Sequence, residues 1–97
     1  MTCSIHHEAQ ADLADAIRYY RSEAGIGVAR RFAAEFERVA RLLEANPRLG
    51  APNASGRRGF ALSVFPFTMI YRQTPTGIRI LVLRHQRRDP EFGAQRS

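Results

Sequence analysis

The segment NPRLGAPN, residues 46–53, divides this 97-residue chain into two halves with different apolar periodicity. Before it, apolar residues recur every three to four positions, and after it they alternate or form short runs. Pro47 has no N–H to donate and disfavours helical backbone in the residue before it, so the helical half should end near Ala45. This change of period predicts an α+β chain, with helices first and strands second.

Two amphipathic helices are predicted before the break. The first covers about residues 8–24, where the apolar positions fall within an arc of about 100° and acidic residues gather in the first turns, as the helix dipole favours. The second runs to about Ala45, with its apolar positions in an arc of about 120°. Gly25 and Gly27 separate the two helices, and so short a connection predicts an antiparallel hairpin.

Three antiparallel strands are predicted after the break, because short runs of aromatic and branched residues alternate with turn residues. Their ranges are Phe60–Phe65, Phe67–Arg72 and Ile78–Leu83, with a turn at Gln73–Gly77. The last run is almost continuously apolar, which is typical of a central strand that is covered on one face and partly on the other. Residues 2–6 are a candidate for a short fourth strand.

The predicted architecture is therefore one domain, residues 1–97, with an N-terminal helix hairpin packed on a small twisted antiparallel sheet of three to four strands. Residues 89–97 are expected to form a helical turn or a frayed tail.

Composition excludes several classes of protein. Apolar residues make up 44% of the chain and charged residues 25%, so the chain should fold. No apolar run approaches the roughly 18 residues of a membrane span, and the N-terminus lacks the basic and apolar regions of a signal peptide, so a cytoplasmic protein without membrane contact is expected. Cys3 is the one cysteine, and no phosphate-binding glycine loop or nucleophile motif occurs. No cofactor is expected.

Positive charge is concentrated in the second half. The net charge is +6, and all 15 basic residues are Arg. Residues 1–50 hold seven Arg and seven acidic residues, whereas residues 51–97 hold eight Arg and two acidic residues. The planar fork of donors on Arg suits phosphate and carboxylate, so a nucleic acid, a nucleoprotein or an acidic protein is the expected partner. A GC-rich genome and a solubilising charge would explain the use of Arg, but not this asymmetry.

The densest polar cluster is residues 84–88, Arg-His-Gln-Arg-Arg, at the end of the last predicted strand. If the strands pair as a meander, Arg58 and Arg72 are expected to approach the same edge of the sheet. Among arginines the imidazolium form of His85 is disfavoured, so His85 would serve as a neutral base or a hydrogen-bonding anchor. The alternative is that His85 bonds the backbone at a strand end and the arginines form a solvated rim.

Two other pairs carry weaker signals. His6 and His7 suggest a metal site, but adjacent side chains diverge and only Glu8 and Gln10 stand nearby to complete it, so no metal is predicted. Tyr19 and Tyr20 suggest base stacking, but Tyr20 lies on the apolar arc and is expected to pack in the core.

Four groups of residues share an order and spacing with a known family. They are Ala9-x-x-Asp12-Leu13 with Tyr19-Tyr20; Pro47-x-x-Gly50; Arg58 with Phe65-Pro66-Phe67 and Tyr71-Arg72; and Ile80-Leu81-Val82-Leu83-x-His85-x-x-Arg88-x-Pro90. Together, over about residues 5–92, they resemble the RelE/ParE superfamily of bacterial type II toxins. The resemblance implies the same helix hairpin on a twisted sheet. It also implies a cognate antitoxin, whose C-terminal segment wraps the toxin as an amphipathic helix or an added strand in a toxin–antitoxin hetero-oligomer.

The RelE-like branch of this superfamily cleaves messenger RNA on the ribosome, where the 2′-OH attacks the adjacent phosphate. If this chain were such an endoribonuclease, the candidate catalytic residues would be His85, Arg84, Arg58 and Arg72. That branch, however, has Arg, Arg and Tyr where this chain has Thr68, Gln86 and Phe92. A Phe cannot transfer a proton, so the resemblance to the nuclease is weakened.

The ParE-like branch binds DNA gyrase, traps its cleaved complex and arrests growth without catalysis of its own. It needs only a binding surface, so this branch is favoured and no catalytic residue is assigned. The residues expected to bind the target or a nucleic acid are Arg58, Arg72, Arg84, His85, Arg87 and Arg88. Those expected to bind the antitoxin, in a groove between hairpin and sheet, are Tyr19, Phe60 and Phe92. A nucleic-acid-binding module without toxicity is a third alternative.

Overall fold

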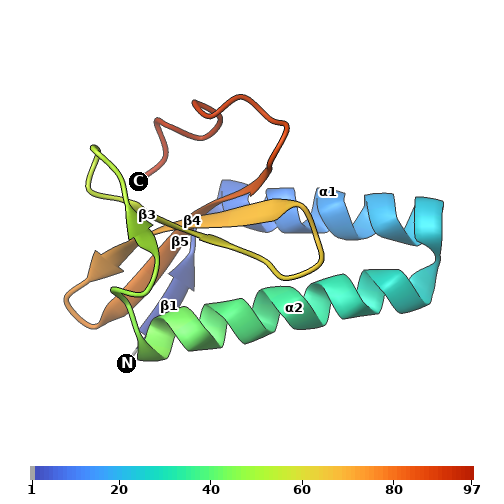
Figure 1. The fold of residues 1–97 in the computed structure, drawn as a ribbon, viewed down its shortest axis with the longest axis horizontal. Coiled ribbons are helices and arrows are strands. Elements are labelled where there is room, and N and C mark those ends of the chain that lie inside the picture. The colour runs from blue at the N-terminus through green and yellow to red at the C-terminus, as the bar shows by residue number, and fades with distance from the viewer. Residues whose placement is uncertain (1) are drawn as a thin grey trace.

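The computed structural model describes residues 2–97. Met1 is the one residue of the predicted domain that lies outside the described residues. Its elements are β1 (Thr2–Ile5), α1 (His7–Ala24), α2 (Ile26–Ala45), β2 (Ala51–Pro52), β3 (Arg58–Ala61), β4 (Phe67–Thr74) and β5 (Gly77–His85). Figure 1 shows the two long helices as an antiparallel hairpin beside the sheet, with the C-terminal segment, in red, returning over the sheet. The predicted α+β architecture is confirmed.

The sheet has five strands in the order β1-β5-β4-β3-β2, which corrects the predicted number of three to four. It is also mixed, because β1 pairs parallel to β5 while every other pair is antiparallel. The chain between these parallel strands first crosses the sheet through the helix hairpin and then returns through β2, β3 and β4. The additional strand, β2, consists of two residues, too few for a periodicity to reveal.

Two predicted boundaries were wrong. The strand predicted to run to Phe65 ends at Ala61, and residues 62–66 form a tight loop instead. The loop forms because Phe65 packs among the aromatic rings of the core rather than continuing a ladder.

Only Gly25 connects the helices, and its φ of 91° and ψ of 168° are a backbone conformation that residues with a side chain rarely adopt. Gly27 lies inside α2.

Both faces of the sheet are covered. The helix face carries the main core, which includes Phe32 and Phe36 of α2 and Met69 and Tyr71 of β4. The opposite face carries a smaller cluster, Ile70, Leu81 and Val82, against which Phe92 packs. The prediction that the last strand is central, with one face covered and the other partly covered, agrees with β5 lying between β1 and β4.

None of the helices in the described part of the chain is long and apolar enough to cross a membrane.

Four aromatic rings join the hairpin to the sheet. Tyr20 of α1 lies 5.1 Å from Phe32 of α2 and 5.2 Å from Phe65, as measured between ring centroids. Phe32 is in turn 5.0 Å from Phe65 and 5.1 Å from Phe67 at the start of β4. Most of these pairs are edge-to-face, the arrangement that aromatic quadrupoles favour. The packing of Tyr20 in this cluster confirms its predicted place in the core.

The connection between α2 and the strands is held by the buried hydroxyl of Tyr71. This hydroxyl accepts the N–H of Gly50 at 2.9 Å and donates to the carbonyl of Pro47 at 2.8 Å. A Cβ on Gly50 would lie 2.6 Å from the same oxygen, so only glycine allows this approach. The break in the sequence is therefore tied directly to β4.

Replacing Tyr71 by Phe should destabilise the fold by about 1–3 kcal/mol, because the Gly50 N–H and the Pro47 carbonyl lose their partner. The free energy of unfolding from urea titration measures this. Tyr19→Phe is the control, since Tyr19 is 61% exposed, and should change the same quantity by less than about 0.5 kcal/mol. Equal effects in the two variants would contradict this role for Tyr71.

Candidate functional site

A groove of about 660 Å³ lies between α1 and the end of β5. Tyr19 and Tyr20 of α1 and Phe67 of β4 supply aromatic surface, while Arg87 and Arg88 supply positive charge. The remaining residues along it are Asp12, Asp15, Ala16, Leu83, His85 and Phe92. The groove therefore combines apolar surface with charged groups, as suits an amphipathic protein segment.

The edge of β5 lies beside this groove and is not paired with a strand beyond Ile80. β1 pairs with β5 only as far as Ile80, so within residues 2–97 no strand continues along this edge. Instead, the N–H of Leu83 donates to the carboxylate of Asp12 at 3.1 Å, and the carbonyl of Leu81 accepts from Arg96 at 3.1 Å. Single side chains thus occupy positions at which a strand could pair.

Asp12 and Arg96 form an ion pair between α1 and the C-terminal segment. One Arg96 nitrogen lies 2.5 Å from a carboxylate oxygen of Asp12, and the two side chains are 8% and 10% exposed for Arg96 and Asp12. The guanidinium also lies over the ring of Phe92, 4.9 Å from its centroid. Arg96 therefore holds Phe92 against the groove.

Residues 89–97 are an ordered tail bound to the sheet, not a frayed end. Four arginines donate to its backbone carbonyls: Arg57 to Gly93, Ala94 and Arg96; Arg72 and Arg79 to Ser97; and Arg84 to Pro90. The tail consists of turns rather than a helix. Much of the positive charge in the second half of the chain therefore serves to hold the tail.

The six arginine and histidine residues predicted to bind a target do not meet at one edge of the sheet. Three of them, His85, Arg87 and Arg88, lie at the groove. Arg84 lies on the opposite face, beside Ile70 and Val82. Arg58 and Arg72 lie toward the other end of β4, where Arg58 donates to the carbonyls of Arg48 and Gly50. The expected approach of all six residues is thus corrected, while binding of a target by any of them stays a prediction.

His85 bonds the backbone at a strand end, the simpler of the two interpretations. Its Nδ1 accepts the N–H of Arg87 at 3.0 Å, and its carbonyl accepts the N–H of Arg88 at 2.9 Å. Its ring packs edge-to-face on Phe67, with 5.1 Å between the centroids. These contacts shape the turn that places Arg87 and Arg88 beside the groove.

Two of the three residues predicted to bind an antitoxin line the groove, namely Tyr19 and Phe92. Phe60 does not, because it lies on β3 and packs against the main core. Asp12 was not predicted as a site residue. The available signal was a carboxylate next to the apolar face of the first helix, but its partner Arg96 is 84 residues away and could not be inferred from spacing.

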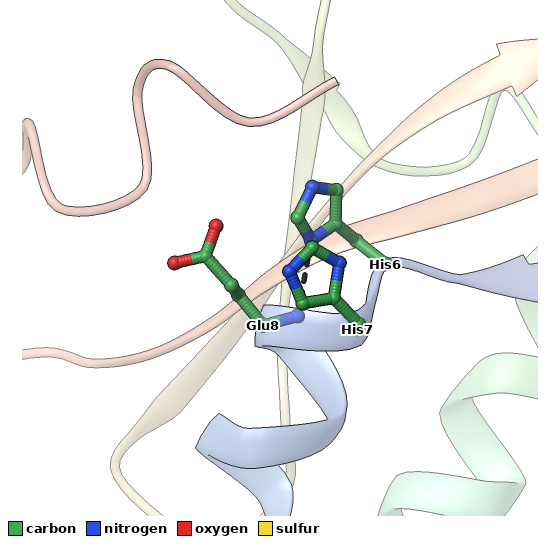
Figure 2. A group of neighbouring side chains, drawn as sticks. All are labelled: His6, His7 and Glu8. Atoms are coloured by element: carbon green, nitrogen blue, oxygen red, sulfur yellow. Dashed lines mark hydrogen bonds between the residues drawn. The ribbon is translucent and has the colours of Figure 1, made fainter.

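Figure 2 shows His6, His7 and Glu8, whose potential metal-ligand atoms lie within 4.8 Å of one another. The Nδ1 of His6 already accepts the N–H of Glu8 at 3.0 Å and so caps α1. The Glu8 carboxylate lies 3.9 Å from Arg96, and the positive end of the helix dipole disfavours a cation here. These contacts suit a helix cap better than a metal site, and the absence of a metal stays a prediction.

The chain is similar to known proteins both in sequence and in structure. A sequence family described as "ParE toxin of type II toxin-antitoxin system, parDE" matches residues 4–90. A solved structure described as "Chromosomal ParDE TA system from P. aeruginosa" is similar with a TM-score of 0.77 and 25% identity, covering 88% of this chain and 95% of that chain. No curated protein matches.

Replacing Arg96 by Ala should destabilise the protein by about 3 kcal/mol, because it leaves the nearly buried carboxylate of Asp12 without its cation. Urea unfolding measures the change. The matched control is Arg41→Ala, which removes an ion pair with Glu37 whose side chains are 81% and 65% exposed and should cost less than about 1 kcal/mol. A loss no larger than that of the control would show that the tail is not held by this pair.

Acidification should weaken the fold through His6. Burial is the largest cause that lowers the pKa of His6 from 6.5, the positive charges of His7, Arg79 and Arg96 add to it, and Glu8 opposes it. His6 therefore binds a proton more tightly in the unfolded chain than in the folded one. Its contribution to the free energy of unfolding is complete above about pH 6.5 and is lost as the pH falls through the lower pKa of the folded state.

The free energy of unfolding should therefore be smaller at about pH 5.5 than at about pH 7.5. His6→Asn keeps a side-chain cap without the titrating group, so its decrease should be smaller than that of the natural chain. Identical pH dependence in both proteins would rule out His6 as the source.

Proposed function

Because this chain belongs to the family of ParE toxins of type II toxin–antitoxin systems, we propose that it binds DNA gyrase, inhibits it and thereby arrests growth until a cognate antitoxin neutralises it. Family membership implies the antitoxin as a partner, whereas gyrase as the target is the specific part of this proposal. The target is a large nucleoprotein assembly, for which a basic protein with a net charge of +6 is electrostatically suited.

One observation favours inhibition by binding over cleavage of RNA: the four candidate nuclease residues do not surround a common point. His85 lies at the groove, whereas Arg84 lies on the opposite face of the sheet. Arg72 and Thr68, the residue paired with Arg84, are four positions apart on β4, or about 13 Å at about 3.3 Å per residue. Phosphoryl transfer needs its charged and proton-transferring groups within contact distance of one phosphate.

The contacts of these side chains favour the same conclusion. Arg58, Arg72 and Arg84 each donate to a backbone carbonyl of the chain itself. Phe92, at the position where the nuclease branch has a tyrosine, packs against Ile70, Leu81 and Val82 and carries no proton to transfer. These groups stabilise the fold and the tail, and a toxin of this kind acts through its surface.

The antitoxin is proposed to occupy the groove between α1 and β5. Tyr19, Tyr20 and Phe67 offer it apolar contacts, and Arg87 and Arg88 offer partners for acidic side chains. An antitoxin strand could pair with the edge of β5 beyond Ile80 only if it displaced the Asp12 and Arg96 side chains, whereas an amphipathic helix could lie on the apolar walls without displacing them. Either mode would bury the aromatic side chains and neutralise the adjacent arginines.

Purified toxin at micromolar concentration should abolish supercoiling by purified gyrase, and a stoichiometric amount of its antitoxin should restore supercoiling. Gel electrophoresis of the plasmid product measures both. Growth arrest on expression without inhibition of gyrase would overturn this target. Cleavage of messenger RNA on ribosomes that is lost in His85→Ala or Arg84→Ala would instead support the nuclease.

A further inference from the structure

The loop between β3 and β4, residues 62–66, holds a highly exposed apolar side chain on a strained backbone. Val64 has a φ of 73° and is 94% exposed. Two successive three-residue turns form the loop, in which the N–H of Phe65 donates to the carbonyl of Ser63 and the N–H of Phe67 donates to the carbonyl of Phe65, both at 2.8 Å. Val64 is the central residue of the first turn, which is the strained form of the γ-turn because its φ is positive.

A β-branched side chain disfavours this backbone conformation, and Val64 is the only non-glycine residue in the described part of the chain with a positive φ. An exposed valine also gains nothing by burial in the free protein. Strain of this kind persists only where the surroundings impose it, and it is concentrated at functional positions. Val64 therefore stands out from scattered surface apolar residues, which need no explanation.

The surroundings hold the loop firmly. The carboxylate of Glu35 on α2 accepts the N–H of Ser63 at 2.7 Å and forms two hydrogen bonds of 2.8 Å with Arg38. The Arg38 hydrogen bond is the main cause of the lowered pKa of Glu35, whose side chain is only 12% exposed. On the other side of Val64, Phe65 packs edge-to-face on Tyr20 and Phe32. Val64 is thus presented by a rigid support.

Positive charge lies next to this loop. The carbonyl of Pro66 accepts the N–H of Gln86 at 2.8 Å, which joins the loop to the turn that carries Arg87 and Arg88. Both arginines are exposed, whereas Arg38 at the base of the loop is paired with the carboxylate of Glu35. A partner that receives Val64 should therefore be a protein with an apolar pocket and acidic residues at its rim, because opposite charges steer and orient such an encounter.

We infer that the β3–β4 loop is a target-binding element, in which Val64 inserts into an acidic-rimmed apolar pocket of the protein that this toxin inhibits. The inference rests on the proposed function in that the toxin acts by binding a protein, but not on that protein being gyrase. The groove proposed for the antitoxin does not include residues 62–66, but it does include Arg87 and Arg88, so the two proposed surfaces are adjacent and share these two arginines. Valine is a small anchor for a pocket. Because the loop already holds it rigidly in place, less conformational entropy is lost when it binds.

The test compares the natural chain with four variants in two assays: the expression level that gives half-maximal growth arrest, and the affinity for the antitoxin encoded beside the toxin. Val64→Gly removes the side chain and adopts the positive φ without strain, so the variant should fold with a thermal midpoint no lower than that of the natural chain. Val64→Ile keeps a branched side chain. Ile26→Ala, at an aliphatic residue that is 51% exposed on the helix hairpin, is the matched control.

Val64→Gly should need at least about tenfold more toxin for growth arrest while its antitoxin affinity is unchanged. Val64→Ile and Ile26→Ala should behave as the natural chain in both assays. Tyr19→Ala, in the groove, should instead lower the affinity for the antitoxin by about tenfold. Unchanged growth arrest by Val64→Gly overturns the inference, whether or not that variant still binds the antitoxin. If the toxin does not inhibit gyrase but Val64→Gly still loses arrest, the proposed target fails and this inference stands.

Discussion

The edge-to-face packing of aromatic rings between the helix hairpin and the sheet is the contact on which the other features depend. Tyr20 and Phe32 bring one ring from each helix, and Phe65 and Phe67 bring two from the segment that enters β4. Such rings bury a large apolar area with few rotatable bonds, so they define a geometry as well as stabilise it. The same rings form a wall of the groove through Tyr20 and Phe67 and fix the base of the Val64 loop through Phe65.

The arginines have a different role from the one that net charge suggests. Arg57, Arg72, Arg79 and Arg84 bind backbone carbonyls of the tail, and the tail covers the apolar cluster on the second face of the sheet. A guanidinium can satisfy several carbonyls of an irregular segment at once, because it carries five donors in one plane. Arginine therefore replaces the regular hydrogen bonds that a tail without helix or strand cannot make for itself.

The tail also connects two surfaces. Phe92 packs on the second face of the sheet and lines the groove, and Arg96 reaches Asp12 of α1. The shape of the groove thus depends on residues from both ends of the chain. Through the turn that follows β5, the groove adjoins the Val64 loop, so the surfaces proposed to bind the antitoxin and the target lie next to each other near one end of the sheet.

Local sequence was enough to predict the elements whose signals repeat along the chain. The helical periods up to Ala45, the stop at Pro47 and the apolar run at Ile78–Leu83 depend on neighbouring residues, so the hairpin and the central strand were predicted correctly. The spacing of motifs also predicted the family. The two-residue β2, the parallel pairing of β1 and the end of β3 at Ala61 have no repeating local signal.

The site depended on contacts between residues far apart in sequence. His85 and Arg84 are neighbours in the chain, yet they point to opposite faces because side chains alternate along a strand. Sequence alone determined that the second half of this chain carries an excess of arginine. Only the tertiary structure decided which arginines bind the tail and which, such as Arg87 and Arg88, lie exposed beside the groove, because hydrogen-bond partners are chosen by proximity in space and not by spacing along the chain.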